Sequence, residues 1–191
     1  MFNISMTNYQ EGILGSAKIK EMITEGFLVK DYLNLEEQLQ PAGFDLTIKR
    51  IQRPMTSGMI KKNSKILPDM VDIMPLDIMR LKDGKDIEGG ETLFGWFLPQ
   101  GSYLAFINEE INLPKGIASI CIQRSSLARS STFHPTSFWD PGYNGKGTVA
   151  LLVDNECGMY LEKDARAVQM IFYTVVGEAF EYNGNYQKEN I

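Results

Sequence analysis

Two arginines and two serines lie close together near the middle of the chain. Arg124, Ser125, Ser126 and Arg129 directly follow an apolar run and begin a new segment. Guanidinium groups form paired hydrogen bonds with phosphate oxygens, and the free N–H groups at the start of a helical turn also bind anions. The segment therefore suits a phosphate chain. A capped surface helix with solvated arginines is the alternative, and this segment alone leaves both interpretations open.

An aspartate in a tight turn is the second feature that could do chemistry. The turn spans residues 138–146, contains Asp140-Pro141-Gly142 and precedes a strand-like run at residues 148–153. Asp140 could act as a general base on water, and the ring of Tyr143 offers a flat face to a sugar. For an isolated Asp-Pro-Gly sequence, however, an Asx turn with a packing aromatic is the better interpretation.

Two further polar residues are interpreted as structural. Asp45 lies in Pro41-Ala42-Gly43-Phe44-Asp45-Leu46, just before the first strand-like run, where a single acid is usually a turn or cap residue. His134 is the only histidine and precedes a proline in a Ser/Thr-rich loop. It lacks the sequence partners of a nucleophile–base pair.

The elements that must position these residues are mostly short strands. From Asp45 onward, runs rich in Ile, Val, Leu, Phe and Tyr alternate with Gly, Pro, Asn and Asp, which is typical of a sandwich or barrel. Such runs cover residues 103–107, 117–122, 148–153 and 167–176. Residues 53–90 are less regular and contain a Lys-Asp-Gly-Lys turn, so they predict an insertion or a long hairpin region.

One helix is predicted near the start of the chain. Ser16 can serve as its N-cap, and Gly26 offers a stop. Between them, three apolar residues fall at helical spacing: Ile19, Met22 and Ile23. At the other end, residues 178–191 are polar and aromatic without a periodic apolar face. We expect this C-terminal arm to be flexible, either frayed or waiting for a ligand.

The composition bounds the class of protein. The chain has 191 residues, of which 43% are hydrophobic, and this predicts one domain over residues 1–191. A net charge of −5 disfavours a nucleic-acid partner and favours a small ligand. No apolar run suits a membrane span or a signal peptide, so we expect a cytoplasmic protein. Cys121 and Cys157 lack metal-site spacing and are predicted to be core thiols.

The order of the polar segments is more specific than any one of them. Five segments follow one another: Ala-Gly-Phe-Asp-Leu (residues 42–46), Gln-Arg-Ser-Ser-Leu-Ala-Arg (123–129), Trp-Asp-Pro-Gly-Tyr-Asn-Gly (139–145), Val-Gln-Met-Ile-Phe (168–172) and Tyr-Asn-Gly-Asn-Tyr-Gln (182–187). This series resembles the five motifs of the dUTPase/dCTP deaminase superfamily. The N-terminal residues 13–28 and Leu113-Pro114 are similar to the deaminase branch.

The resemblance implies a fold and an assembly. It implies a mainly β subunit with a short N-terminal helix, in a distorted β-barrel or jelly-roll-like dUTPase-like fold of the β-clip type. The subunits would form a homotrimer with active sites at the subunit interfaces, each binding a small-molecule deoxynucleoside triphosphate. Mg²⁺ is the implied cofactor, held by the nucleotide phosphates and water, with no protein metal ligands.

The resemblance also assigns roles to individual residues. Asp140 would be the catalytic residue that activates or orients water, and Tyr143 would pack under the deoxyribose. The remaining substrate contacts would come from the arginine segment and the last two motifs: Arg124, Ser125, Ser126, Arg129, Gln169, Tyr182, Tyr186 and Gln187.

One position separates the two reactions of the superfamily. Deaminases of this kind carry a glutamate ten positions after the aspartate of the Asp-Pro-Gly motif, and here that position is Ala150. A methyl group cannot relay a proton. We therefore expect a dUTP diphosphatase that forms dUMP and pyrophosphate. A dCTP deaminase, a bifunctional dCTP deaminase/dUTPase and a non-catalytic nucleotide-binding or regulatory protein are the alternatives.

The chain also departs from the typical pattern of dUTPases. Gly142 stands where those enzymes have a second acid, and Asn185 stands where deaminase-branch relatives often have a lysine. The C-terminal arm is short and lacks the usual glycine-rich, arginine-bearing sequence. It therefore contributes less positive charge toward the phosphates.

Overall fold

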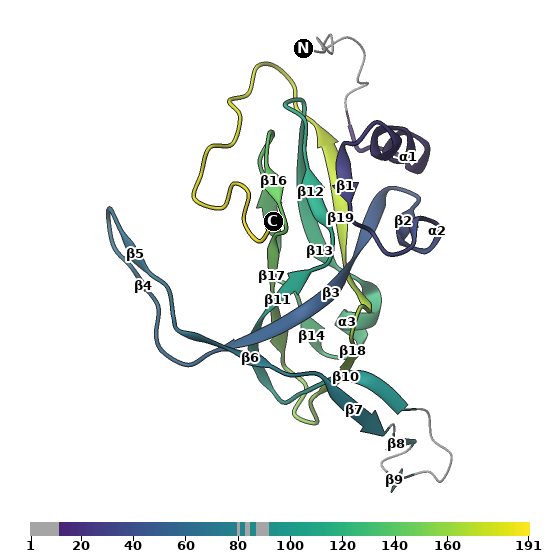
Figure 1. The fold of residues 1–191 in the computed structure, drawn as a ribbon, viewed down its shortest axis with the longest axis vertical. Helices are drawn as coiled ribbons and strands as arrows, with labels where there is room; N and C mark the ends of the chain where they lie inside the picture. Colours follow the sequence, from purple (N-terminus) through teal and green to yellow (C-terminus); the bar gives the residue numbers. More distant parts are fainter. Residues whose placement is uncertain (1–11, 80, 83–84, 87–91) are drawn as a thin grey trace.

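The computed structural model describes residues 12–79, 81–82, 85–86 and 92–191. The chain is mainly β, as expected, and its largest sheet curls into an open half-barrel (Figure 1). Along this sheet the strand order is β14-β17-β11-β3-β19-β13-β15, and every neighbouring pair is antiparallel. The strands are β3 (Gly43–Pro54), β11 (Gly101–Ile107), β13 (Ile117–Gln123), β14 (Thr132–Phe133), β15 (Ser137–Trp139), β17 (Thr148–Val153) and β19 (Arg166–Thr174).

The long strand β3 joins the two parts of this sheet. Its first half pairs with β19 and with the short strand β2 (Leu39–Gln40), and its second half pairs with β11 and with β6 (Met70–Ile73). Every residue from position 43 to 48 is buried, so both faces of the first half of β3 are covered. Irregular pairing beside Val168 and Ile107 bends the ladder on either side. These bends curl the sheet instead of leaving it flat.

Gly43 shows how closely the strands approach in this region. A Cβ atom at this position would lie 2.7 Å from the carbonyl oxygen of Met170 on β19. The glycine of the Ala-Gly-Phe-Asp-Leu segment is therefore required by the contact between β3 and β19.

The N-terminal helix forms where the periodicity predicts it. Helix α1 (Ser16–Thr24) buries Ile19, Met22 and Ile23. The predicted N-cap was wrong, because Gly15 occupies that position and no side chain caps the helix. The N–H of Ser16 instead donates to the carbonyl of Pro41, so the neighbouring chain segment satisfies it. Helix α2 (Leu35–Gln38) has a capping side chain, since Asn34 accepts hydrogen bonds from two N–H groups of its first turn.

Two three-stranded sheets and two hairpins complete the fold. One sheet has the order β1-β12-β16, with β1 (Leu28–Lys30), β12 (Glu110–Asn112) and β16 (Asn144–Gly145). The other has the order β18-β10-β7, with β18 (Met159–Glu162), β10 (Thr92–Leu98) and β7 (Leu76–Met79). The hairpins are β4 (Met59–Ile60) with β5 (Lys65–Ile66), and β8 (Leu81–Lys82) with β9 (Lys85–Asp86).

The irregular region 53–90 therefore contains strands β4 to β9. The β4–β5 hairpin projects from the body of the molecule (Figure 1). The centre of the predicted Lys-Asp-Gly-Lys turn, residues 83–84, lies outside the described residues. No helix in the described ranges is long and apolar enough to cross a membrane.

The C-terminal segment packs against its own chain in this structure. The N–H of Lys188 donates to the carbonyl of Asn144 at 2.7 Å, and the N–H of Lys146 donates to the carbonyl of Glu189 at 2.9 Å. The segment thus lies beside β16, on residues 144–146. The arm that we expected to be free is held here by backbone hydrogen bonds.

The two cysteines have different environments. Cys121 is a buried core thiol on β13, as predicted. The same prediction was wrong for Cys157, which is exposed. Cys157 lies in a turn, where its N–H donates to the side chain of Asn155, and not in a strand.

Candidate active site

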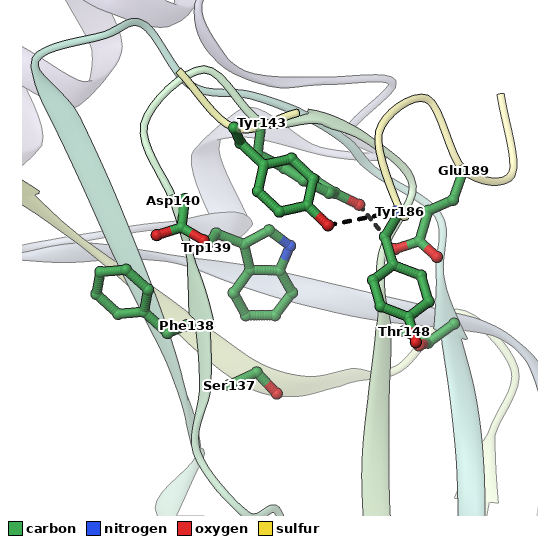
Figure 2. Close-up of a pocket in the computed structure, with 9 residues that line it drawn as sticks. Ser137, Phe138, Trp139, Asp140, Tyr143, Thr148, Tyr186 and Glu189 are labelled. Carbon is green, nitrogen blue, oxygen red and sulfur yellow. Dashed lines mark hydrogen bonds between the residues drawn. The ribbon is translucent and has the colours of Figure 1, made fainter. Parts of the chain in front are cut away.

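A pocket of about 210 Å³ lies between strand β15, strand β17 and the C-terminal segment (Figure 2). We call it the tyrosine pocket. Four of the predicted site residues line it: Asp140, Tyr143, Tyr182 and Tyr186. Its other lining residues are Ser137, Phe138, Trp139, Thr148 and Glu189. The Asp-Pro-Gly-Tyr segment and the C-terminal motif therefore meet at one place.

The Asp-Pro-Gly sequence forms the turn that presents Asp140. The N–H of Tyr143 donates to the carbonyl of Asp140 at 3.2 Å, and Gly142 has φ +82°. A proline followed by a residue of positive φ is the arrangement of a type II turn. The turn directly follows β15 and leaves Asp140 exposed. A side chain at position 142 would be strained in this conformation, which explains the glycine at a position where typical dUTPases have an acid.

Tyr143 is enclosed by aromatic rings. Its ring centroid lies 6.5 Å from that of Trp139 and 5.7 Å from that of Tyr182. Its hydroxyl donates to the Glu189 carboxylate at 2.9 Å. Burial raises the pKa of Tyr143 well above its ordinary value, and the Glu189 charge raises it further. Tyr143 therefore remains a neutral phenol that can donate a hydrogen bond.

Glu189 lies in the pocket as a partly buried acid. Burial raises its pKa above the ordinary value, and the hydrogen bond from Tyr143 opposes this shift. Tyr143 is only 4% exposed beneath the C-terminal segment. In this structure the C-terminal segment and the neighbouring aromatic rings therefore cover most of Tyr143.

Gln187 fastens the C-terminal segment to the turn. Its side-chain oxygen accepts from the N–H of Asn144 at 3.0 Å, and its side-chain nitrogen donates to the carbonyl of Gly142 at 2.9 Å. In this structure the predicted substrate contact Gln187 thus binds protein backbone. Its contacts are on the same segment that presents Asp140 and Tyr143.

The side chain of Ala150 lies on the same face of β17 as the pocket residue Thr148. The strand alternates between buried Val149 and Leu151 and the outward-facing Thr148 and Ala150. Since side chains two residues apart lie on one face of a strand, Ala150 extends the surface that begins at Thr148. An acid at position 150 would stand beside the pocket, and here only a methyl group stands there.

The predicted phosphate segment lies at the far end of β13. Arg124 follows this strand and is the N-cap residue of helix α3 (Ser125–Arg129). Ser125, Ser126 and Arg129 are exposed on this helix. Gln169 lies on the neighbouring strand β19, opposite Ile122 of β13. The second and fourth sequence motifs are therefore adjacent.

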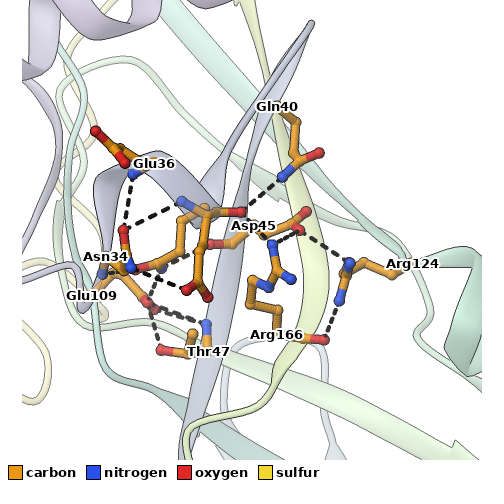
Figure 3. A network of polar contacts seen from close by, with 10 residues as sticks. Asn34, Glu36, Gln40, Asp45, Thr47, Glu109, Arg124 and Arg166 are labelled. Atoms are coloured by element: carbon orange, nitrogen blue, oxygen red, sulfur yellow. Dashed lines mark hydrogen bonds and ion pairs between the residues drawn. The ribbon is translucent and has the colours of Figure 1, made fainter.

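Asp45 binds the arginines, and its prediction as a turn or cap residue was wrong. It lies inside β3, is 1% exposed, and its carboxylate lies 3.0 Å from Arg124 Nε and 3.7 Å from Arg166 Nη1 (Figure 3). Arg124 also donates to the carbonyl of Arg166 at 2.8 Å. We call these three residues the arginine cluster. Burial raises the pKa of Asp45, and the two guanidinium charges oppose this shift.

A second buried acid braces the strand that carries Asp45. Glu109 is completely buried (Figure 3). Its carboxylate accepts hydrogen bonds from the N–H of Thr47, from the hydroxyl of Thr47 at 2.6 Å and from the side-chain nitrogen of Gln38 at 2.7 Å. Gln38 also donates to the carbonyl of Asp45 at 2.9 Å. Burial raises the pKa of Glu109, and these hydrogen bonds oppose the shift. The brace fixes the backbone beside the arginine cluster.

One chain does not bring the tyrosine pocket and the arginine cluster together. Trp139, next to Asp140, pairs with Ser119 of β13, and Arg124 lies five residues further along. At about 3.3 Å per residue this is roughly 17 Å of strand. The tyrosine pocket and the arginine cluster are thus separate within one chain, and we refer to them below as the two half-sites of the candidate active site.

Sequence reasoning missed several residues of these half-sites. Trp139 and Phe138 belong to the segment that was singled out, but their place in the pocket was not predicted. Arg166, Glu109 and Glu189 gave no local signal, because each acts through a residue that is distant in sequence. A buried acid becomes recognisable only when the strand pairing is known.

The comparisons with known proteins agree with this architecture. A family model described as dCTP deaminase-like matches residues 13–175. The chain belongs to the dCTP deaminase-like family. This confirms the superfamily that the five segments indicated. Among curated proteins, a probable deoxyuridine 5′-triphosphate nucleotidohydrolase of Methanosarcina barkeri is 36% identical over 93% of this chain and 98% of its own. A protein of the same name from Archaeoglobus fulgidus is 30% identical, over 94% of this chain and 98% of its own.

A solved structure supports the fold. The 2′-deoxycytidine 5′-triphosphate deaminase of Agrobacterium tumefaciens matches with a TM-score of 0.62 at 17% identity. The match covers 87% of this chain and 49% of that one. At 17% identity, this likeness shows only that the two proteins share the dUTPase-like β fold.

Proposed function

We propose that the protein is a dUTP diphosphatase, which hydrolyses dUTP to dUMP and pyrophosphate. The observation that carries the proposal is Ala150, on the strand face beside the pocket in a chain of the dCTP deaminase-like family. Deamination of cytosine needs a group that moves protons to and from the ring, and a methyl group cannot do so. Curated relatives named as probable dUTP nucleotidohydrolases support the same reaction.

In this proposal Asp140 is the general base. Its exposed carboxylate at the pocket takes a proton from water, and the water oxygen attacks the α-phosphorus. The bond from that phosphorus to the bridging oxygen breaks, and pyrophosphate leaves. Tyr143 packs against the deoxyribose once the C-terminal segment has opened, and this packing leaves no room for a 2′-hydroxyl.

The phosphate chain is held by the arginine half-site of a neighbouring subunit in a homotrimer. Arg124 is already oriented by Asp45, so little reorganisation is needed when the charge of the phosphates arrives. Ser125, Ser126 and Arg129 on α3 add hydroxyl and guanidinium donors. The separation of the two half-sites along β13 supports this arrangement. Within one chain, the tyrosine pocket and the arginine cluster are too far apart to contact the same phosphate group of a nucleotide.

Mg²⁺ fits this site when the phosphates of the substrate and water, and not protein side chains, supply most of its ligands. In the described ranges no three acidic, histidine or cysteine side chains are grouped to hold a metal, and the Asp45 carboxylate already faces two arginines. Phosphate oxygens and water are the ligands that Mg²⁺ prefers when few carboxylates are present. When bound, the ion would neutralise charge on the triphosphate.

A nucleotide panel tests the proposal against its alternatives. The purified protein is incubated with each deoxynucleoside triphosphate, and with UTP, in the presence of Mg²⁺, while pyrophosphate and ammonia are measured. We expect pyrophosphate from dUTP and no ammonia from dCTP. Ammonia from dCTP would favour a deaminase or bifunctional enzyme. Nucleotide binding without either product would favour a regulatory protein.

A further inference from the structure

A lysine of the projecting hairpin reaches the rim of the tyrosine pocket. Lys65 lies on β5, and its Nζ donates to the hydroxyl of Tyr186 at 2.5 Å. The same nitrogen lies 4.2 Å from the centroid of the Tyr186 ring. Tyr186 lines the pocket. The hairpin, which lies far from the pocket in sequence, therefore places a positive charge on a pocket residue.

The charge of Lys65 is not neutralised by these contacts. A phenol and an aromatic face attract an ammonium group but carry no net negative charge. Lys65 makes no ion pair with the residues that the structure describes. By contrast, Lys146, on the segment beneath the C-terminal arm, is paired with Asp31 at 2.6 Å. Lys65 is thus a cation at the rim that is available to an anionic ligand.

The C-terminal segment itself offers little positive charge. Residues 178–191 contain three glutamates and one lysine. The pocket also contains the Asp140 and Glu189 carboxylates. A nucleoside triphosphate that enters here needs a compensating cation near the segment that covers it.

We propose that Lys65 is a phosphate-binding residue, which supplies from the β4–β5 hairpin the positive charge that the C-terminal segment lacks. The inference rests on the proposed function, because it assigns a ligand contact within the same site. Lys65 would hold Tyr186 when the site is empty and contact the phosphate chain when a nucleotide is bound. The hairpin thereby becomes part of the cover of the site.

Binding measurements with ligands of different phosphate content test this role. Affinities of the imido analogue of dUTP and of deoxyuridine are measured by calorimetry for the wild type and for Lys65→Met, Lys65→Arg and Lys62→Met. Lys62 is an exposed lysine of the same hairpin and serves as the matched control. Loss of one charge-assisted contact should weaken analogue binding by Lys65→Met about 10- to 100-fold. Deoxyuridine affinity should stay unchanged, Lys65→Arg should retain most of the analogue affinity, and Lys62→Met should resemble the wild type.

Two results would overturn the inference. An equal loss of affinity for deoxyuridine and the analogue in Lys65→Met would mean that the lysine acts only by holding Tyr186. An equal effect of Lys65→Met and Lys62→Met would mean that only the general charge of the hairpin matters. Binding is measured here without turnover. A wild type that binds the analogue through its phosphates but releases no pyrophosphate from dUTP would refute the proposed function and leave the role of Lys65 intact. A wild type that binds neither ligand would refute both.

Discussion

The arginine cluster and the tyrosine pocket are built in different ways. The arginine cluster is fixed by paired strands, by the buried carboxylate of Asp45 on β3, and by Glu109, which lies in the bend between β11 and β12 (Figure 3). The tyrosine pocket lies between β15, β17, the turn at Asp140 and the C-terminal segment, which is held through Gln187 and Glu189 (Figure 2). The arginine cluster is therefore held by groups inside the fold, whereas the tyrosine pocket is covered by a segment at the end of the chain.

This difference matches the tasks of the two half-sites. Charged groups that stabilise a reacting phosphate are most effective when they are oriented before the substrate arrives. A surface that encloses a base and sugar must let them in and out, and segments with few buried apolar contacts move most readily. The sheet thus supplies the fixed charges, and the C-terminal segment supplies the cover.

The largest expected effect comes from the base in the tyrosine pocket. Asp140→Asn removes the proton acceptor but keeps the size of the side chain and the exposed position. Turnover of dUTP should fall by at least about 100-fold, the usual scale for loss of a general base, while nucleotide affinity stays near the wild-type value. Steady-state kinetics and calorimetry check both parts. Wild-type turnover in this variant would show that another group is the base.

Removal of the acid of the arginine cluster should act on stability as well as activity. Asp45→Ala removes the buried counter-charge of two partly exposed guanidinium groups and the ion pairs that join β3 to them, so the free energy of unfolding should fall by about 2 kcal/mol. The control is Asp72→Ala, which breaks the exposed pair of Asp72 with Arg50 and should cost less than about 1 kcal/mol. Denaturant unfolding measures both variants. Similar losses in the two would mean that the arginine cluster is not a buried network.

A smaller effect is expected at His134, which lies in the chain between the two half-sites. Its ring donates to the carbonyl of Ala150, and burial lowers its pKa. The folded protein therefore takes up a proton on this histidine at a lower pH than the unfolded chain, whose histidine is protonated below about pH 6.5. Stability from this group is present above that pH and is lost as the pH falls through it.

The pH effect is measured as a difference between two proteins. Between about pH 7.5 and 5.5 the wild type should lose up to about 1 kcal/mol more than His134→Gln. Since His134 is the only histidine, no other side chain of this type contributes in that window. Parallel pH profiles for the two proteins would contradict the buried neutral state.

The sequence predicted those features that depend on nearby residues. The apolar runs became β11, β13, β17 and β19, and the first helix buried its predicted face, because periodicity is a local property. The tight turn at Asp140 followed from its proline and glycine. Five segments in fixed order indicated the family even though each was ambiguous alone.

Features that depend on distant partners could not be predicted in this way. Asp45 is a buried counter-ion because β3, β19 and the end of β13 bring two arginines to it. Lys65 meets Tyr186 because a hairpin folds toward the C-terminus. Cys157, predicted to be a core thiol, is exposed because it lies in a turn, where its N–H donates to the side chain of Asn155. In each case strand pairing or chain folding, and not composition, decides the environment.

The most direct test of the two-half-site account is subunit complementation. Arg124→Ala and Asp140→Asn each disable one half-site and should be nearly inactive alone. They are co-expressed with different tags, and mixed trimers are purified and assayed with dUTP and Mg²⁺. If each active site combines the arginine half-site of one subunit with the tyrosine pocket of its neighbour, every mixed trimer has one intact site of three, so the purified mixed trimers should show about one third of the wild-type activity. Mixed trimers that are no more active than either variant alone would contradict the account.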